Sequence, residues 1–323
     1  MNTSSPQVWW RRPGESVVKR FQMDAAGDMI FRYAPFQDAD QFPIVELRGH
    51  AEACEFPKEG SVKGLREGEV NDIRKDQHIE GIHQALKEIE EGTFEKVVLS
   101  RSEFWQTSRS PEALFRSKCH AYPHAFVYLL SHPNAGVWLG ATPELLLHQS
   151  DESYRTVSLA GTKAESDDKW TEKERREQHL VTDFIEQILR ANEATGIQVG
   201  EVHDRAYGHL RHLETNICFR SASPPEQLLS VLHPTPAVGG NPREAALQFI
   251  EANEAAPRGY YAGYLGLIQS ESSDFYVNLR CMQCYTNGYR VFAGGGIVQG
   301  SKPEDEWQET QVKIDSIRTK LTS

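Results

Sequence analysis

A run of glycines and acids at residues 293–310, AGGGIVQGSKPEDEWQET, could bind either a phosphate or a metal ion. A phosphate-binding P-loop needs a lysine directly after its last glycine, and here Ser301 follows Gly300. A dinucleotide-binding turn needs a third glycine, which is missing because Val298 and Gln299 separate the run from Gly300. The segment therefore meets neither phosphate-binding signature.

The acids after the glycines are spaced for one face of a helix. Pro303 suits the first turn of a helix, and Glu306, Glu309 and Lys313 then follow at intervals of three and four residues. Acids in a first turn can simply complement the positive end of the helix, which is one interpretation. Two carboxylates on one face are also the hard oxygen ligands that Mg²⁺ takes. Glu177, at the head of another expected helix, is a candidate third ligand.

Apolar spacing predicts the elements that must position these groups. We expect helices over residues 77–91, 111–119, 170–196, 224–231 and 242–254, and from residue 303 onward. We expect strands over residues 96–105, 125–132, 135–142, 144–149, 154–161, 197–203, 213–219, 260–268, 274–285 and 289–293. Adjacent strands with interspersed helices, rather than strict alternation, indicate an α+β fold with a large, mainly antiparallel sheet.

Composition limits the class of protein. The chain has 323 residues and a formal net charge of −11, which argues against a large nucleic-acid-binding surface. Its start has no signal-peptide core, and no apolar run has the roughly 20 residues that a membrane helix needs. We therefore expect a soluble, cytoplasmic protein that contacts neither nucleic acid nor membrane.

The five cysteines form no metal or disulfide pattern. Cys281 and Cys284 make a lone CxxC inside an apolar run, where an extended strand would point them to opposite faces. We expect both to be buried free thiols.

Several motifs together resemble one family. They are KVVLSR (96–101), GATPELLL (140–147), LAGT (159–162), EKERREQHLV (172–181), HLETNI (212–217), LHPTPAVGGNP (232–242), RGYYAGYLG (258–266) and AGGGIVQGSKPEDEWQET (293–310). In this order and spacing the chain resembles the chorismate-utilising enzymes, and among them the isochorismate synthases. The resemblance covers about residues 75–315.

This resemblance implies a fold and a domain organisation. It implies a two-lobed sandwich of large antiparallel sheets with helices packed outside. Residues 76–323 would be the chorismate-binding catalytic part, and residues 1–75 a shortened form of the family's variable N-terminal part. We expect one compact domain overall.

The resemblance also implies an activity: Mg²⁺-dependent isomerisation of chorismate, with water adding at ring carbon 2 and the hydroxyl leaving carbon 4. Lys96 matches the family's water-activating base, although a lysine at a strand edge is the ordinary interpretation. Glu144 matches the general acid, which needs a raised pKa in a poorly hydrated pocket, although it could simply be a charge that opens a strand.

The other site residues come from the same resemblance. Its metal carboxylates match Glu177, Glu309 and, directly or through water, Glu306. Positions that contact the substrate match Gly161, Thr162, His212, Tyr261, Arg280, Gly294, Gly295 and Lys313. Of these, Arg280, Tyr261 and Lys313 would bind the enolpyruvyl carboxylate, and His212 could either react or orient the ring.

Two residues separate the subfamilies. Ala160 stands where aminodeoxychorismate synthases have a nucleophilic lysine, and Lys96 is absent from anthranilate synthases, which use ammonia. Isochorismate synthase is therefore preferred, with no glutaminase subunit and with a monomer or homodimer as the active form. Salicylate synthase, which also eliminates pyruvate, stays an alternative, and so does a non-catalytic chorismate-binding homologue. Both menaquinone and siderophore pathways would fit.

Overall fold

The computed structural model describes residues 5–37, 39–70, 72–164, 169–207 and 210–319, and these contain six helices. None of the helices is long and apolar enough to span a membrane. The helices are α1 (Lys75–Glu90), α2 (Pro111–Ala121), α3 (Glu172–Ala191), α4 (Pro225–Leu232), α5 (Arg243–Asn253) and α6 (Pro303–Thr319).

The same residues contain one 17-stranded sheet. Its strands are β1 (Gln7–Arg11), β2 (Val18–Met23), β3 (Met29–Ala34), β4 (Val45–Cys54), β5 (Lys96–Gln106), β6 (Phe126–His132), β7 (Gly136–Thr142), β8 (Leu145–Ser150), β9 (Ser153–Ala164), β10 (Thr195–Val199), β11 (His203–Tyr207), β12 (Leu210–Arg220), β13 (Gly240–Asn241), β14 (Tyr264–Ile268), β15 (Ser272–Val277), β16 (Cys281–Tyr285) and β17 (Gly288–Val298).

Pairwise hydrogen bonding joins the strands into one antiparallel ladder. Its order is β13, β5, β17, β16, β7, β6, β1, β2, β4, β3, β14, β15, β8, β9 and β12, with β10 and β11 both paired to β12. The ladder folds back on itself, because strands far apart in it touch face to face. Tyr33 of β3 packs against Tyr128 of β6, and Phe126 of β6 stacks on Tyr276 of β15 with ring centroids 4.7 Å apart. The expected α+β fold with a large antiparallel sheet is confirmed.

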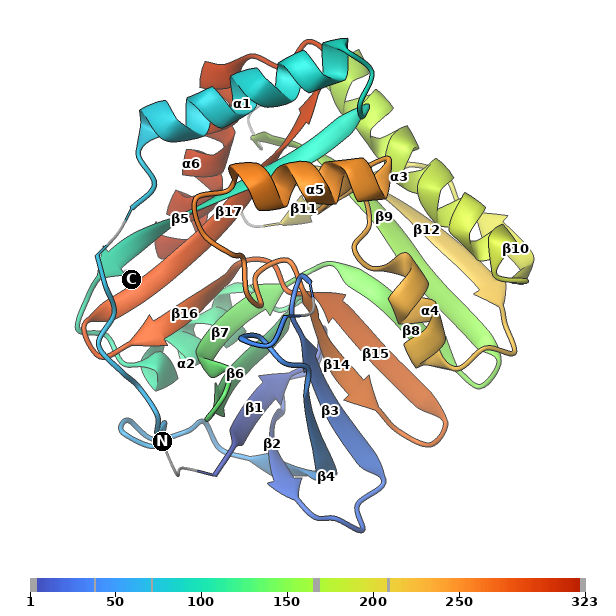
Figure 1. The fold of residues 1–323 in the computed structure, drawn as a ribbon. Coiled ribbons are helices and arrows are strands. Elements are labelled where there is room, and N and C mark those ends of the chain that lie inside the picture. Colours follow the sequence, from blue (N-terminus) through green and yellow to red (C-terminus); the bar gives the residue numbers. More distant parts are fainter. Residues whose placement is uncertain (1–4, 38, 71, 165–168, 208–209, 320–323) are drawn as a thin grey trace.

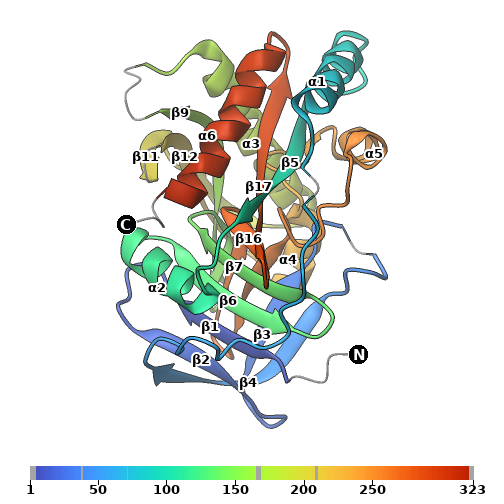
Figure 2. The ribbon, with the colours of Figure 1, turned by 90° about the vertical axis from the view of Figure 1, so that its left-hand side faces the viewer.

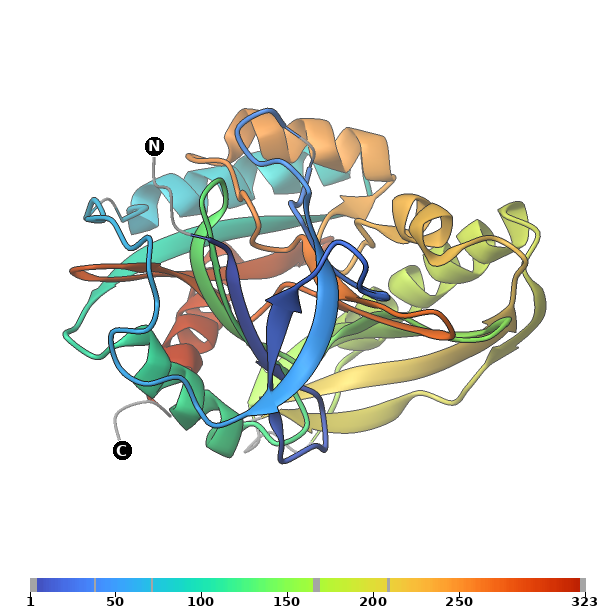
Figure 3. The same ribbon diagram turned by 90° about the horizontal axis from the view of Figure 1, so that it is seen from below.

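The N-terminal strands lie in the middle of this ladder rather than beside it. Strand β1 pairs with β6, and β3 pairs with β14, so β1–β4 join the two halves of the sheet. They lie at the end of the molecule opposite α1, α3, α5 and α6 (Figure 1), and they cross its centre when it is viewed from below (Figure 3). The boundary at residue 75 stays a prediction, but strands β1–β4, within residues 7–54, belong to the same sheet as the strands that follow.

Most expected elements are present within a few residues, and three strand expectations were wrong. The expected strand 197–203 is two strands, β10 and β11, separated by residues 200–202, and the expected helix 170–196 already ends at Ala191. Residues 260–263 form a turn instead of the start of a strand, because Ala262 has a left-handed backbone (φ 58°). The expected strand 274–285 is two strands, broken before β16 where Arg280 has φ 51°. The thiols behave as expected: Cys281 and Cys284 are free, buried, and belong to hydrophobic clusters on opposite sides of β16.

Candidate active site

The two ends of the strand ladder meet around a cavity. Strands β5 and β17 with helix α6 form one wall, and β9 and β12 with helix α3 form the other (Figures 1 and 2). The cavity holds about 800 Å³ of space free of protein atoms, part of it open to solvent. Its lining includes ten of the expected site residues: Glu144, Gly161, Thr162, Glu177, His212, Tyr261, Arg280, Gly294, Glu309 and Lys313. Lys96, Gly295 and Glu306 lie directly behind this lining.

The glycine run is strand, not loop. Residues 294–296 lie inside β17 and pair with residues 98–100 of β5. A Cβ atom on Gly296 would lie 2.6 Å from Glu177 Oε1, and one on Gly294 would lie 3.1 Å from the Tyr261 hydroxyl. Gly295 faces the opposite side, against α6, and so does not reach the cavity. The run therefore makes room for side chains from other elements to approach the β17 backbone.

A buried ion pair lies behind the cavity wall. Lys96 is fully buried, which contradicts a strand-edge role, and its Nζ lies 2.8 Å from Glu177 Oε1. No described residue accepts a hydrogen bond of good geometry from this Nζ. Burial works to raise the pKa of Glu177, but the Lys96 ammonium outweighs it and lowers the pKa below its usual value. Glu177 is thus an ionised carboxylate at the cavity surface.

Glu144 sits in a contrasting environment. It follows β7, it is 4% exposed, and its side chain lines the cavity. Burial raises the pKa of Glu144 from 4.5 to about 8, and the nearby Lys96 offsets only part of this effect. The carboxyl group is therefore mostly protonated at neutral pH, as a general acid requires.

A β-bulge positions the next group of residues. Between β9 and β12, Thr162 pairs with His212 and Ala160 with Leu213, so Gly161 is the extra residue, with φ 66°. The bulge directs the Gly161 carbonyl oxygen toward His212 Nδ1, 3.2 Å away. A carbonyl oxygen only accepts, so Nδ1 carries the proton and Nε2 is an acceptor. Burial, with Arg280 and Lys313 nearby, lowers the pKa of His212 to about 3, so the ring is neutral.

Two cations and a phenol line the far part of the cavity. Arg280 donates from Nη1 to the Ser316 hydroxyl at 2.8 Å. Lys313 donates to the Gly294 carbonyl at 2.9 Å and to Glu309 Oε1 at 2.7 Å. The Tyr261 ring stacks on Phe292 with centroids 5.3 Å apart, and burial raises the pKa of its hydroxyl, which stays a neutral donor. A guanidinium, an ammonium and a phenol together suit a carboxylate ligand.

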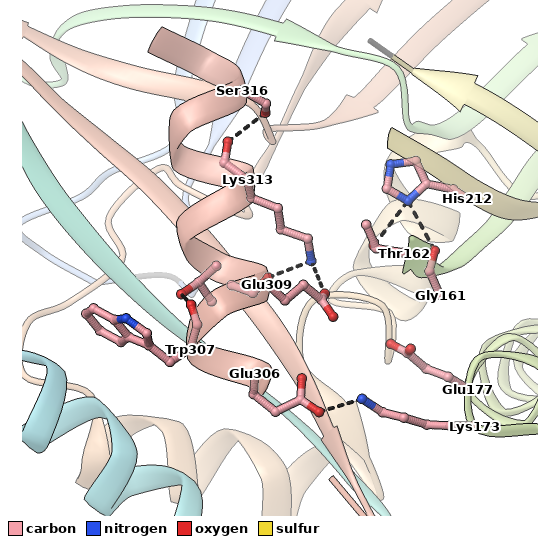
Figure 4. A network of polar contacts seen from close by, with 12 residues as sticks. Gly161, Thr162, Lys173, Glu177, His212, Glu306, Trp307, Glu309, Lys313 and Ser316 are labelled. Carbon is pink, nitrogen blue, oxygen red and sulfur yellow. Dashed lines mark hydrogen bonds and ion pairs between the residues drawn. The ribbon is translucent and has the colours of Figure 1, made fainter. Parts of the chain in front are cut away.

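The three expected metal carboxylates each hold a different lysine. Glu177 on α3 pairs with Lys96. On α6, Glu306 pairs with Lys173 and Glu309 with Lys313 (Figure 4). In the described part of the chain no three acid, histidine or cysteine side chains are already gathered as a metal site. Each acid is paired with a lysine, and the role of the three acids as metal ligands stays a prediction.

The donor set nevertheless fits a hard divalent cation. The carboxylates come from two facing helices, and Glu306 Oε2 is buried with no well-formed hydrogen bond from any described residue. Partial burial acts to lower the pKa of Lys173, but Glu306, then Glu309 and Glu177, raise it, so all three acids act at one place. Mg²⁺ needs only one or two protein carboxylates when water and substrate supply the other oxygens.

Comparison with known proteins identifies the family. The profile described as "Chorismate binding enzyme" matches residues 47–322. The chain belongs to the chorismate-binding enzymes. It is 34% identical over 255 residues to the isochorismate synthase MenF of Escherichia coli K12, and 32% identical over 247 residues to the isochorismate synthase EntC of the same strain. These alignments cover 74% and 69% of the chain, which spans 59% and 61% of those relatives' lengths.

The fold of the chorismate-binding enzymes is confirmed by a solved structure. The menaquinone-specific isochorismate synthase MenF of Escherichia coli superimposes with a TM-score of 0.83 at 24% identity, over 99% of this chain and 90% of that one. The likeness establishes the arrangement of strands and helices, including β1–β4, where the motifs in the sequence are weak.

Two arginines of this chorismate-binding enzyme support the site, although the sequence motifs that contain them predicted no role for either. Arg101 of β5 stacks on Trp307 of α6, with its guanidinium 3.8 Å from the ring centroid, and donates from Nε to the Thr310 hydroxyl at 2.7 Å. It thereby ties to the sheet the helix that carries Glu306 and Glu309. Arg258 is buried and donates to Glu254 and to the Val98 carbonyl. An arginine within an apolar strand, KVVLSR, was the available signal for Arg101.

Proposed function

We propose that the protein is an isochorismate synthase, a Mg²⁺-dependent isomerase that converts chorismate to isochorismate. The observation that carries the proposal is the placement of two proton-transfer groups at one cavity: the Glu144 carboxyl, whose burial raises its pKa to about 8, and the buried amine of Lys96. The reaction needs one acid and one base at the same time. Relatives named isochorismate synthases, at 32–34% identity, supply the substrate class.

Lys96 would accept a proton from the water that adds to ring carbon 2, a step that starts from the neutral amine rather than from the ammonium that pairs with Glu177. The ammonium that forms would be stabilised by Glu177, whose oxygen is 2.8 Å away. Glu144 would donate its proton to the hydroxyl that leaves carbon 4, so the leaving group departs as water. Ala160 lines the cavity where, by the resemblance, aminodeoxychorismate synthases carry a nucleophilic lysine, which favours water over that covalent route.

Chorismate carries two carboxylates, and the cavity offers a place for each. Arg280, Lys313 and the Tyr261 hydroxyl would bind the enolpyruvyl carboxylate through charge-assisted hydrogen bonds. His212 Nε2 would accept a hydrogen bond from a substrate hydroxyl and so orient the ring, because a neutral imidazole with pKa near 3 does not donate from that atom.

Glu177, Glu306 and Glu309 would hold Mg²⁺ beside the ring carboxylate. The ion, when bound, supplies positive charge that neutralises this carboxylate and fixes its orientation. The position of these acids on the facing helices α3 and α6, and the burial of Glu306, support this assignment.

Product analysis tests the proposal directly. Purified protein is incubated with chorismate and Mg²⁺, with EDTA as the metal-free control, and the products are separated by chromatography. We expect chorismate and isochorismate to reach a stable mixture, with no product in EDTA. Salicylate with pyruvate would instead assign the salicylate synthase reaction, and no Mg²⁺-dependent product would contradict both and favour a non-catalytic chorismate-binding protein.

Variant proteins test the assigned base. Lys96→Ala should lose at least about 10²-fold in turnover, the lower range for a general base. Lys302→Ala, at an exposed lysine just before α6, is the matched control and should keep full activity. Near-normal turnover by a folded Lys96→Ala protein would exclude Lys96 as the base.

A further inference from the structure

Each of the acids that would bind Mg²⁺ forms an ion pair with a lysine in this structure. Three carboxylates, on Glu177, Glu306 and Glu309, face three ammonium groups, one per acid. A divalent cation placed among the carboxylates would meet those ammonium groups at short range, where like charges repel strongly in a poorly hydrated site. At least one lysine therefore has to move when the ion binds.

The three lysines differ in how free they are to leave. Lys96 is 0% exposed, and Lys313 is 17% exposed and is also hydrogen-bonded to the Gly294 carbonyl. Lys173 is 32% exposed and forms an ion pair with Glu306 Oε1, at 2.5 Å. It lies in the first turn of α3, one helical turn before Glu177, so its flexible stem can swing from the site into water.

We propose that Lys173 is a built-in substitute for the metal: its ammonium occupies the Mg²⁺ position against Glu306 in the metal-free enzyme and is displaced when the ion binds. This inference rests on the Mg²⁺ site of the proposed function. Lys173 is then a positioning residue, which keeps Glu306 in place without metal and sets how tightly the ion binds.

The environment of Glu306 explains why such a substitute is needed. Its side chain is 1% exposed, and a carboxylate buried without a counter-charge is strongly destabilising. One of its oxygens contacts Lys173, and the other, Oε2, lacks a well-formed hydrogen bond from the described residues. Glu306 would thus be one of the residues that hold the ion, through a carboxylate that Lys173 otherwise neutralises.

Titration of Mg²⁺ into the full-length, metal-free chain by calorimetry tests the inference. Lys173→Met keeps the length of the side chain and removes the competing charge. We expect its Kd for Mg²⁺ to fall about tenfold, which corresponds to about 1.4 kcal/mol. Lys173→Arg retains the charge and should bind Mg²⁺ as weakly as the wild type or more weakly, while Lys302→Met should match the wild type.

Thermal unfolding separates metal substitution from ordinary support of the helix. In EDTA, Lys173→Met should unfold at a lower temperature than the wild type, because Glu306 loses its counter-charge. In saturating Mg²⁺ the two should unfold at the same temperature. An equal loss in both conditions, with an unchanged or weaker Kd, would overturn the inference, as would a wild-type chain that binds no Mg²⁺.

The outcome is separable from that of the proposed function. A chain that makes no isochorismate but shows these Mg²⁺ shifts would contradict the proposed activity and support the lysine exchange. A chain that makes isochorismate without the shifts would contradict the exchange alone.

Discussion

Glu144→Gln should make the protein more stable at alkaline pH while abolishing its activity. The Glu144 carboxyl has a pKa of about 8 in the folded chain, against 4.5 for the same group in water. The folded state therefore holds the proton more tightly than the unfolded state does. Its contribution to stability is fully present below about pH 4.5 and is lost as the pH rises through about 8. Glutamine has a similar shape and does not ionise.

The magnitude follows from the two pKa values. Each pH unit between them changes the free energy of unfolding by about 1.4 kcal/mol, so ionised Glu144 destabilises the fold by about 5 kcal/mol in total. Between about pH 5.5 and about pH 8.5 the wild type loses about 3 kcal/mol that the variant keeps. Other titrating groups are common to both proteins and cancel in the comparison.

Urea denaturation of both proteins at those two pH values measures this difference. The free energy of unfolding of Glu144→Gln relative to wild type should rise by about 3 kcal/mol from the lower to the higher pH. Turnover of the wild type should also fall above about pH 8, and the variant should lose about 10²- to 10⁴-fold at every pH. Parallel stability curves for the two proteins would refute the buried, protonated carboxyl.

Three further changes probe the site. Gly296→Ala should lower turnover by at least about tenfold and destabilise the fold by about 1–3 kcal/mol, because the new Cβ would lie 2.6 Å from Glu177 Oε1 and displace it. Gly81→Ala is the control, because the nearest atom to its Cβ would be 3.6 Å away. A Gly296→Ala protein with the urea midpoint and turnover of the wild type would contradict this prediction. Glu309→Gln should weaken Mg²⁺ binding at least about tenfold by calorimetry, and an unchanged titration would remove it as a ligand. Arg101→Lys should destabilise the protein by about 1–2 kcal/mol and raise the Mg²⁺ requirement, whereas loss of stability alone would assign Arg101 no part in positioning the carboxylates.

The sequence predicted the elements well because its helices and strands are strongly patterned. Pro111 and Pro303 begin helices as expected, and the apolar face of residues 172–191 is a buried helix face. The strands expected over residues 260–268 and 274–285 failed where single residues take a left-handed backbone, at Ala262 and Arg280. Nothing in the type of either residue signals that conformation, which the surrounding structure imposes.

The site was predicted by resemblance rather than by spacing. Lys96 read alone is a strand-edge lysine, and only the folded chain shows it buried against Glu177. Lys96 begins β5 and Glu177 lies on α3, far along the chain, and no local sequence pattern predicts a contact across such a separation. The same reason hid Lys173, whose partner Glu306 lies on a different helix. Helical spacing predicted correctly that Glu309 and Lys313 would share one face of α6, where they form a local ion pair.

The glycine run reconciles the two halves of the site. A strand alternates its faces, so Gly294 and Gly296 open toward the cavity while Gly295 opens toward α6. Without side chains on either face, α6 packs directly on β17, and Glu177 reaches across from α3 to meet Lys96. A strand with ordinary side chains here would hold the two helices apart by the width of those side chains. The three glycines therefore let acids from α3 and α6 approach each other beside β17, where the proposed function places Mg²⁺.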